Sequence, residues 1–296
     1  MENKLNDPKL KEELQDAINL SEILHTTLMH ISTAFDDESE EQEPDVTRLT
    51  YNSGLDTNKT FDNFIEGISN KQPRITGLSI AEQKDEVTYN PFFIYGPSGC
   101  GKSHLANAIG VCCREKNPKM KVVYVTARQF QYQFTDSLTQ DTTFDFRNFY
   151  QSVDLLIVDD IQEWMNAPKT LSAFFYVFNH LLRNGKQIII TSDRPPVNLK
   201  GMDERILKHL ASGLIVELEK PDMQLCIDIL NDKCRQYDLN ISADIVEFIA
   251  KSINGCMYDL ESVMNSLKVY FDVNKTNIDI NIVKRVIMRS VKLDNK

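Results

Sequence analysis

The chain has 296 residues, of which 42% are hydrophobic and 26% are charged, a composition that excludes a fibrous or wholly disordered protein. Its formal net charge is −10, and the first fifty residues hold thirteen acidic residues against four basic ones. The remaining residues are close to neutral, so the charge does not indicate a broadly basic nucleic-acid-binding protein.

The chain shows no signal for a membrane or for secretion. Its apolar runs are far shorter than the ~20 residues that cross a bilayer, and a charged stretch follows Met1 where a signal peptide would be apolar. The six cysteines form no CxxC pair, so we expect reduced thiols and no zinc site. These features predict a cytoplasmic protein.

Residues 1–35 are predicted to form an amphipathic helix. Asp7 and Pro8 are a favourable helix start, and apolar residues then recur on one stripe from Leu10 to Phe35. Residues 36–54 are acidic and polar and predict a flexible linker. We interpret residues 8–35 as an interaction surface for a second copy or another protein, with packing onto the chain's own body as the alternative.

Residues 55–220 are predicted to form a nucleotide-binding α/β domain. Short apolar runs separated by segments long enough for helices indicate a parallel sheet that is covered on both faces. Residues 221–296 show only helical periodicity and predict a helical domain. The expected strands are Phe92–Tyr95, Val122–Val125, Leu155–Val158, Ile188–Ile190 and Leu214–Leu218, and the expected helices are Met223–Tyr237, Ser242–Ile253, Met257–Val273 and Ile280–Val291.

A phosphate-binding loop with the spacing G-x-x-x-x-G-K-[ST] follows the first expected strand. The glycines allow successive backbone N–H groups to converge on a phosphate, at the positive end of the next helix. Lys102 is expected to reach the β- and γ-phosphates, and the Ser103 hydroxyl to bind Mg²⁺. The loop consists of Gly96, Pro97, Ser98, Gly99, Cys100, Gly101, Lys102 and Ser103.

Acidic residues end the third expected strand. Asp159 is predicted to orient the Mg²⁺ shell, and Asp160 to polarise an attacking water. The fourth strand ends in polar residues up to Asp193, at the edge where open α/β sheets bind ligands. Together with the loop, these residues predict an ATP- or ADP-binding site.

Three segments carry a resemblance to a known family. Residues 89–96, residues 153–162 (Val-Asp-Leu-Leu-Ile-Val-Asp-Asp-Ile-Gln) and residues 191–196 resemble the AAA+ domain of the DnaA family of bacterial replication initiators. The resemblance covers residues 55–292 and implies an AAA+ P-loop NTPase fold, with a five-stranded parallel sheet and a C-terminal helical lid, preceded by the N-terminal helix. It implies that ATP or ADP binds with Mg²⁺.

The resemblance also assigns residues to the site. Residues 60–67 resemble the family's segment beside the adenine, so Phe64 and Ile65 are expected to contact the nucleotide, as is His104 directly after the loop. Asp193 takes the sensor position near the γ-phosphate, and Lys102, Asp160 and Asp193 are the expected catalytic residues.

This sequence departs from the family at two positively charged positions. The residue expected to act in trans as an arginine finger aligns with His209, with Arg205 retained on the same segment, and Tyr258 stands where the lid usually has an arginine. We therefore expect slow ATP hydrolysis, or hydrolysis that depends on a partner.

The expected function is initiation or regulation of DNA replication through protein contacts. Expected partners are a DnaA-type initiator, the replicative helicase, or a second copy bound through residues 8–35. The alternatives are a helicase loader, a nucleotide-regulated scaffold without turnover, and a complete initiator cut at the lid. Because the chain ends at Lys296, shortly after the last lid helix, we expect a form without the family's helix-turn-helix domain and without specific binding to duplex DNA.

Single-stranded DNA is a further candidate partner, with weak binding expected. Residues 128–149 resemble the family's helical insert that contacts single strands, but they hold only Arg128 and Arg147 as basic residues. Lys169 lies where the family has a strand-contacting arginine. The aromatic residues of the insert either stack on bases or form the core of a helix pair.

Overall fold

The computed structural model describes residues 52–82, 89–253, 256–274 and 278–290. The helix predicted over residues 8–35 and nearly all of the acidic linker lie outside these described residues. Within them, the elements from residue 52 to residue 217 form the sheet domain, and the elements from residue 223 onward form the lid.

Five strands form a single parallel sheet in the order β2-β3-β4-β1-β5. This confirms the predicted α/β class and sheet. The fourth strand is longer than predicted because Gln187, Thr191 and Ser192 are buried within it, although they are polar. The strands are β1 (Phe92–Tyr95), β2 (Val122–Thr126), β3 (Leu155–Asp159), β4 (Gln187–Ser192) and β5 (Leu214–Glu217).

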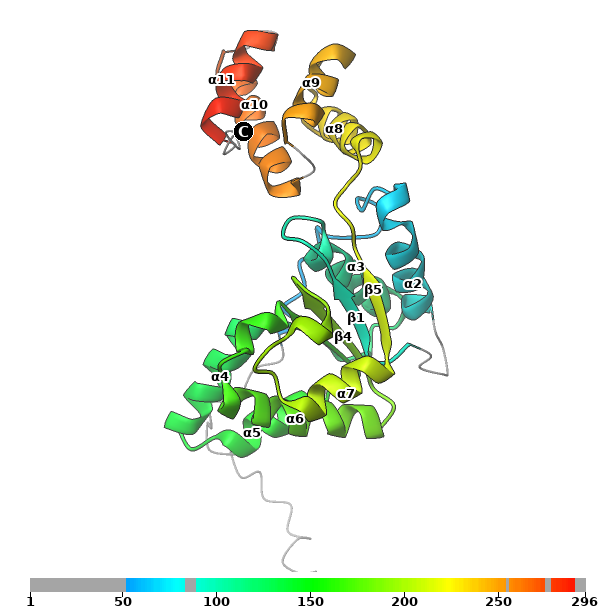
Figure 1. Ribbon diagram of the computed structural model, residues 1–296, viewed down its shortest axis with the longest axis vertical. Coiled ribbons are helices and arrows are strands. Elements are labelled where there is room, and N and C mark those ends of the chain that lie inside the picture. Colours follow the sequence, from blue (N-terminus) through cyan, green and yellow to red (C-terminus); the bar gives the residue numbers. More distant parts are fainter. Residues whose placement is uncertain (1–51, 83–88, 254–255, 275–277, 291–296) are drawn as a thin grey trace, which may run out of the picture. The chain divides into compact units, whose positions relative to one another are not determined.

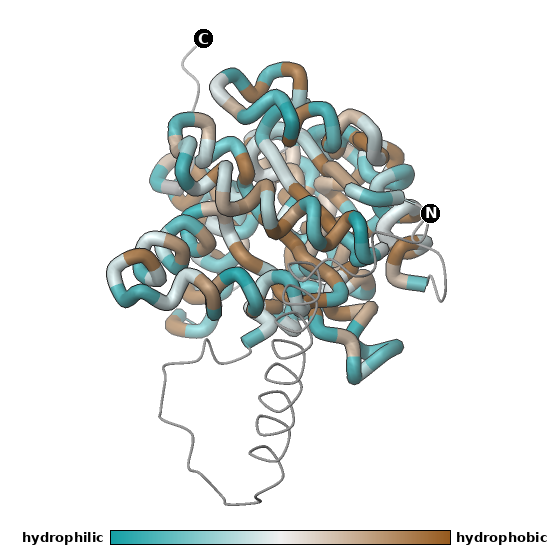
Figure 2. Tube along the Cα trace, turned by 90° about the horizontal axis from the view of Figure 1, so that it is seen from below, coloured by the Kyte–Doolittle hydropathy of each residue, from teal (hydrophilic) through white to brown (hydrophobic). Residues whose placement is uncertain are grey.

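Helices cover both faces of the sheet (Figure 1). Neighbouring strand residues point to opposite faces: Phe93 belongs to the core under α4–α7, whereas Phe92 and Ile94 belong to the core under α2 and α3. In Figure 2, hydrophobic stretches of the chain, coloured brown, gather in the interior. The helices are α2 (Lys71–Glu82), α3 (Lys102–Lys116), α4 (Ala127–Thr139), α5 (Thr143–Gln151), α6 (Pro168–Arg183) and α7 (Glu204–Ser212), with 3₁₀ turns η1 (Ile68–Asn70), η2 (Ile161–Trp164) and η3 (Pro196–Asn198).

The lid is helical throughout its described residues. Its helices are α8 (Met223–Tyr237), α9 (Ala243–Ile253), α10 (Met257–Asn274) and α11 (Ile280–Ser290), each within one residue of the predicted bounds at either end. They enclose a separate apolar core that includes Leu230, Ile249, Val263 and Val283. Among the described helices, none is both long enough and apolar enough to cross a membrane.

Candidate nucleotide-binding site

The phosphate-binding loop connects β1 to α3, as its sequence predicts. Gly101 caps α3 with φ of 103°, a left-handed conformation that L side chains rarely adopt. A Cβ on Gly96 would lie 2.1 Å from the carbonyl oxygen of Leu218, so a side chain has no room there. Lys102 is buried, and its ammonium group donates to the carbonyl oxygens of Gly96 and Pro97, each at 2.9 Å. The ammonium group of Lys102 is therefore hydrogen-bonded to the backbone of the loop itself.

Asp159 ends β3 and is 4% exposed. The phenol of Tyr124 donates to its Oδ2 at 2.6 Å, and the hydroxyl of Thr191 donates to its Oδ1. A buried carboxylate costs free energy unless it is hydrogen-bonded, and these two donors satisfy both oxygens. The structure therefore fixes the orientation of this acid from the neighbouring strands β2 and β4.

Asp160 follows in a left-handed backbone conformation, with φ of 60°. Its amide donates to the Thr191 hydroxyl at 2.9 Å, and its carboxylate accepts from the Gln162 amide at 2.9 Å. Burial raises the pKa of the Asp160 carboxyl, and the charge of Asp159 adds to this shift. Gln162 in turn accepts from the amide of Asp193 at 3.2 Å, so it links the two acids assigned to the γ-phosphate.

The carboxylate of Asp193 is paired with its own neighbour. Arg194 donates two hydrogen bonds to it, both at 2.7 Å, and this pairing lowers the pKa of the Asp193 carboxyl. The positive charge of Lys102 also lowers the pKa of the Asp193 carboxyl and opposes the upward shift of the Asp160 pKa. The sequence analysis did not predict the pairing with Arg194.

A cavity of about 220 Å³ adjoins the loop and is large enough for a nucleobase. The predicted nucleotide contacts Phe64, Ile65 and His104 all line it, together with Cys100 and Gly101. Side chains of the lid complete its wall, among them Leu225, Ile229, Lys233, Met257 and Glu261.

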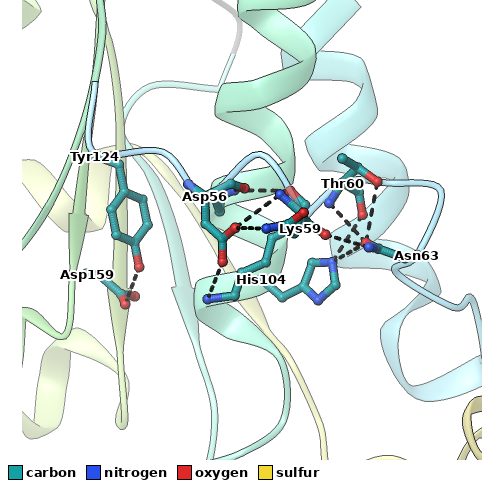
Figure 3. A network of polar contacts seen from close by, with 9 residues as sticks. Asp56, Lys59, Thr60, Asn63, His104, Tyr124 and Asp159 are labelled. Carbon is teal, nitrogen blue, oxygen red and sulfur yellow. Dashed lines mark hydrogen bonds and ion pairs between the residues drawn. The ribbon is translucent and has the colours of Figure 1, made fainter. Parts of the chain in front are cut away.

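Residues 52–65 form a strap that crosses α3 and leads into this cavity (Figure 3). The buried side chain of Asn107 accepts from the amide of Asp56 and donates to the carbonyl oxygens of Asp56 and Lys59. One turn earlier on the same helix, His104 Nε2 lies 3.1 Å from the carbonyl oxygen of Thr60 and 2.9 Å from Asn63 Oδ1. The strap is therefore anchored just before Phe64.

These contacts fix the tautomer of His104. Asn63 Oδ1 also accepts from the amide of Thr60, so both partners of Nε2 are acceptors and the proton must lie on Nε2. Burial lowers the pKa of the imidazole, which favours its neutral form. The ring of Phe64 packs against it edge-on, with the centroids 5.3 Å apart.

The lid reaches the phosphate loop through the start of α10. The amide of Met257 donates to the carbonyl oxygen of Gly99 at 3.1 Å, and the ring of Tyr258 lies beside Gly99. Partial burial raises the pKa of the Tyr258 phenol, and the negative charges of Asp160 and Asp159 add to the shift. The charges of the acids at the site therefore act on the phenol of Tyr258.

The two residues of α7 considered for the arginine-finger role differ in accessibility. His209 is half-buried, with its ring 5.9 Å from that of Phe178 and 6.3 Å from that of Phe175. Arg205 is exposed, stacks 4.2 Å above the Phe175 ring and pairs with Asp203. Of the two, only Arg205 presents a permanent charge at the surface.

The aromatic insert is largely core. Phe130, Phe146 and Tyr150 are buried in the sheet domain, so they are not available to stack on bases. Tyr132 and Phe144 are 72% and 71% exposed. Phe134 and Phe149 also pack against this core, so among the aromatic residues of the insert the core interpretation fails only for Tyr132 and Phe144.

The oxygen ligands present at the loop suit Mg²⁺. This ion prefers oxygen and is usually held by one or two protein side chains together with phosphates. The Ser103 hydroxyl and the Asp159 carboxylate provide such oxygens, and the phenol of Tyr124 donates a hydrogen bond to the Asp159 carboxylate. Within the described part of the chain, no group of three or more His, Cys, Asp or Glu side chains could hold a metal by itself.

Sequence reasoning missed Tyr124 and Asn107. Tyr124 donates to a residue 35 positions away, and Asn107 binds the strap 51 positions away. Asn107 carries one local signal, because it lies one helical turn after His104 and shares its face. Tyr124 sits among the three valines of β2, where its hydroxyl needs a partner.

The sheet order, the loop on β1 and the acids on β3, with a helical lid beside the loop, define a P-loop NTPase of the AAA+ class. The profile of the bacterial DnaA ATPase domain matches residues 55–217, more than half of the chain. The chain therefore belongs to the DnaA family.

Individual relatives agree with this assignment. The chromosomal replication initiator protein DnaA of Bacteroides fragilis is 43% identical over 242 residues, covering 82% of this chain and 51% of that protein. Domain III of DnaA from Thermotoga maritima superimposes with a TM-score of 0.76 at 29% identity, over 80% of this chain and 99% of that one. A replication initiator DnaA bound to AMPPCP and single-stranded DNA gives a TM-score of 0.68 at 29% identity, over 75% of this chain and 69% of that one. The chain spans about half the length of the curated relatives it matches.

Proposed function

We propose that the chain binds ATP or ADP together with Mg²⁺ and acts in the initiation or regulation of DNA replication. One observation carries the proposal: the phosphate loop after β1 and the buried Asp159 at the end of β3 lie at the carboxyl edge of one parallel sheet, and the base-sized cavity adjoins the loop. The solved relative bound to AMPPCP supports the choice of an adenine nucleotide.

Each part of the site has one role in this proposal. Lys102 and the loop amides hold the phosphates, Ser103 and Asp159 hold Mg²⁺, and the cavity beside Phe64, Ile65 and His104 takes the base. When bound, Mg²⁺ offsets the negative charge of the phosphates. In this proposal Asp160 polarises the attacking water and Asp193 acts near the γ-phosphate.

A thermal unfolding assay tests this proposal. Nucleotide at about 100 times its Kd stabilises a protein by about 2.7 kcal/mol, and Lys102→Ala should abolish this gain. Lys119→Ala, which removes an exposed lysine at the surface, is the matched control and should keep it. Equal nucleotide-dependent stabilisation of Lys102→Ala and the wild-type chain would contradict the site.

We further propose that hydrolysis by the chain alone is slow. Catalysis of phosphoryl transfer draws on cations placed around the transferred group, and an arginine finger contributes on the order of 10³–10⁵ in rate. His209 is held between two phenylalanine rings and Tyr258 carries no positive charge, so Arg205 or an arginine of a partner protein must complete the site. Phosphate release from the isolated chain faster than about 1 s⁻¹, an ordinary enzyme rate, would contradict this.

The partners follow from the family and from the sequence. We propose contact with replication proteins, either a DnaA-type initiator or the replicative helicase, or with a second copy, through residues 8–35. A variant without residues 1–45 should bind nucleotide as the full chain does and lose the partner or the self-association. Retention of the partner by this variant would exclude that surface.

Single-stranded DNA is a second candidate partner, and the observation that favours it is the exposure of Tyr132 and Phe144. Aromatic side chains that stack on bases contribute about 1–3 kcal/mol per base. Binding of labelled oligothymidine, measured by anisotropy with Mg²⁺ and AMPPCP, should weaken in Tyr132→Ala and Phe144→Ala. Unchanged binding in both variants excludes stacking at these residues.

A further inference from the structure

Two polar side chains hold the end of the strap from the side of α2, beyond its anchors on α3. Asn70 is the last residue of η1, is 6% exposed and lines the base cavity. Arg74 lies one helical turn later on α2, with its side chain 22% exposed. Both side chains bind the backbone of the segment that contributes Phe64 and Ile65 to the cavity.

Asn70 binds the backbone on both sides of Glu66. Its Nδ2 donates to the carbonyl oxygen of Ile65, and its Oδ1 accepts from the amide of Gly67, each at 2.8 Å. A carbonyl oxygen can only accept and an amide N–H can only donate, so these partners fix which way the side-chain amide is turned. The two bonds therefore oppose any change of backbone conformation between Ile65 and Gly67.

Arg74 binds the residues just before. Its Nε donates to the carbonyl oxygen of Phe64 at 3.3 Å, and its Nη2 donates to that of Phe61 at 3.4 Å. Its Nη1 donates to a carboxylate oxygen of Glu66 at 3.0 Å, and the guanidinium lies 5.8 Å from the centre of the Phe61 ring. The planar guanidinium presents its donors in a fixed geometry, so it can hold several acceptors at once. Arg74 thus binds the carbonyl oxygen directly before the one that Asn70 binds.

The backbone held in this way sets the direction of two side chains that line the cavity. The ring of Phe64 lies toward the phosphate loop, because a Cβ on Gly101 would lie 3.3 Å from it. The side chain of Ile65 packs against the apolar core of the lid. A shift of the backbone between these two residues would therefore displace two walls of the cavity at once.

The helix that carries Arg74 is fixed to the helix that follows the phosphate loop. Gly77 lets α2 approach α3 closely, because a Cβ there would lie 2.9 Å from the side chain of Ile109. The two helices lie side by side in Figure 1. The clamp, which consists of Asn70 and Arg74, is therefore placed relative to the phosphate loop by helix packing within the protein.

We propose that Asn70 and Arg74 are positioning residues of the base cavity, which hold Phe64 and Ile65 in the conformation that receives the base. These roles rest on the proposed function, because they assign the base to that same cavity. Holding a segment in its bound conformation raises affinity, since the entropy cost of ordering it is not paid on binding. Freeing the backbone of a single residue is expected to weaken binding by about tenfold.

The test compares a ligand that has a base with one that has none. ADP and inorganic tripolyphosphate are titrated separately against the full chain in excess Mg²⁺, as competitors of a fluorescent ADP analogue whose own affinity is measured for each variant. Asn70→Ala removes both bonds of the side-chain amide and should weaken ADP binding by about tenfold. Its affinity for tripolyphosphate should stay that of the wild-type chain, because the clamp does not bind the phosphate loop.

Asn90→Ala is the matched control. Asn90 also bridges two backbone atoms, donating to the carbonyl oxygen of Lys186 at 2.8 Å and accepting from the amide of Ile188 at 2.9 Å. These bonds lie near the amino ends of β1 and β4, whereas the phosphate loop follows the carboxyl end of β1. The control should therefore lose stability as Asn70→Ala does and keep its affinity for ADP.

Arg74→Met tests the clamp independently, including the case in which Asn70→Ala does not fold. Methionine keeps an unbranched side chain beside Phe61 and removes every donor of the guanidinium. This variant should also weaken the binding of ADP and leave the binding of tripolyphosphate unchanged.

The outcomes separate the two proposals. A wild-type chain that binds neither ADP nor tripolyphosphate overturns the proposed function. Normal wild-type binding with unchanged ADP affinity in Asn70→Ala, or in Arg74→Met where only that variant folds, overturns the role of the clamp alone. Equal losses for ADP and tripolyphosphate also overturn it, as does an equal loss of ADP affinity in Asn90→Ala, because both indicate general damage to the fold.

Discussion

The backbone amide of Met257 donates a hydrogen bond to the carbonyl oxygen of Gly99, across 3.1 Å. Met257 begins helix α10 of the lid, and Gly99 lies within the phosphate loop. The contact is made by backbone atoms on both sides, so it depends on the conformation of the loop and of the start of α10, not on either side chain.

Gly99→Ala tests this contact. Gly99 has φ of 75°, and a Cβ there would lie 3.0 Å from the Tyr258 ring and 3.3 Å from Cys256 Sγ. We expect a loss of about 1–2 kcal/mol in unfolding free energy from the left-handed backbone, and in addition weaker nucleotide binding because the lid is displaced. Urea unfolding and nucleotide titration measure the two effects.

The chain offers a matched control in Gly185→Ala. Gly185 has a similar φ of 63°, but a Cβ there would meet nothing within 4 Å. This variant should lose comparable stability and keep its nucleotide affinity. If both variants lost affinity equally, the contact of loop and lid would have no part in binding.

Asn107→Ala should destabilise the strap. The variant leaves the amide of Asp56 and the carbonyl oxygens of Asp56 and Lys59 without their partner, and an orphaned buried group costs about 1–3 kcal/mol. Because the strap places Phe64 at the cavity, nucleotide affinity should fall as well. Asn148→Ala, at an exposed position of α5, should change neither stability nor affinity.

His104 should make stability depend on pH. Burial lowers its pKa in the folded chain, so below the unfolded value of ~6.5 the unfolded chain binds more protons than the folded one. Its contribution to stability is therefore fully present above that pH and is lost progressively as the pH falls below it.

His104→Gln isolates this contribution. Glutamine keeps an N–H donor for Thr60 and Asn63 but does not titrate, so the decline of the urea midpoint between pH 7 and pH 5 should be shallower than in the wild-type chain. His180→Gln, at an exposed position of α6, should keep the wild-type slope. An unchanged slope in His104→Gln would falsify the assignment.

The sequence predicted the parts of the site that are local in the chain and missed those that depend on distant contacts. The loop and the acid pair Asp159 and Asp160 can be recognised in the sequence, because binding of phosphate and metal requires particular residue types at a fixed spacing beside apolar strands. The partners of the Asp159 carboxylate, however, come from β2 and β4, and no spacing in the sequence indicates a contact across a sheet. The sequence analysis also missed the pairing of Asp193 with Arg194, for a different reason. Adjacent residues on a strand usually point apart, and these two side chains meet only because the chain turns after β4.

The last prediction concerns the distinction between ATP and ADP. Tyr258 is 61% exposed, lies beside Gly99 and is acted on by the charges of Asp159 and Asp160. A longer side chain has room there, and a hydrogen bond from a charged group contributes about 1.5–3 kcal/mol. Tyr258→Arg should therefore raise the affinity for ATP relative to ADP by about tenfold, which corresponds to about 1.4 kcal/mol.

A substitution to arginine in α7 should act differently. His209 is half-buried against Phe175 and Phe178, so His209→Arg must first displace packed rings and should lower the unfolding free energy. Tyr258→Phe serves as the control for the lid, because it removes the hydroxyl without adding charge and should leave the ATP-to-ADP ratio unchanged. Competition titrations of ATP and ADP against a fluorescent analogue measure the ratio for each variant. Equal affinity of Tyr258→Arg for both nucleotides would show that the start of α10 does not reach the γ-phosphate, and the weak discrimination expected of this chain would then need another cause.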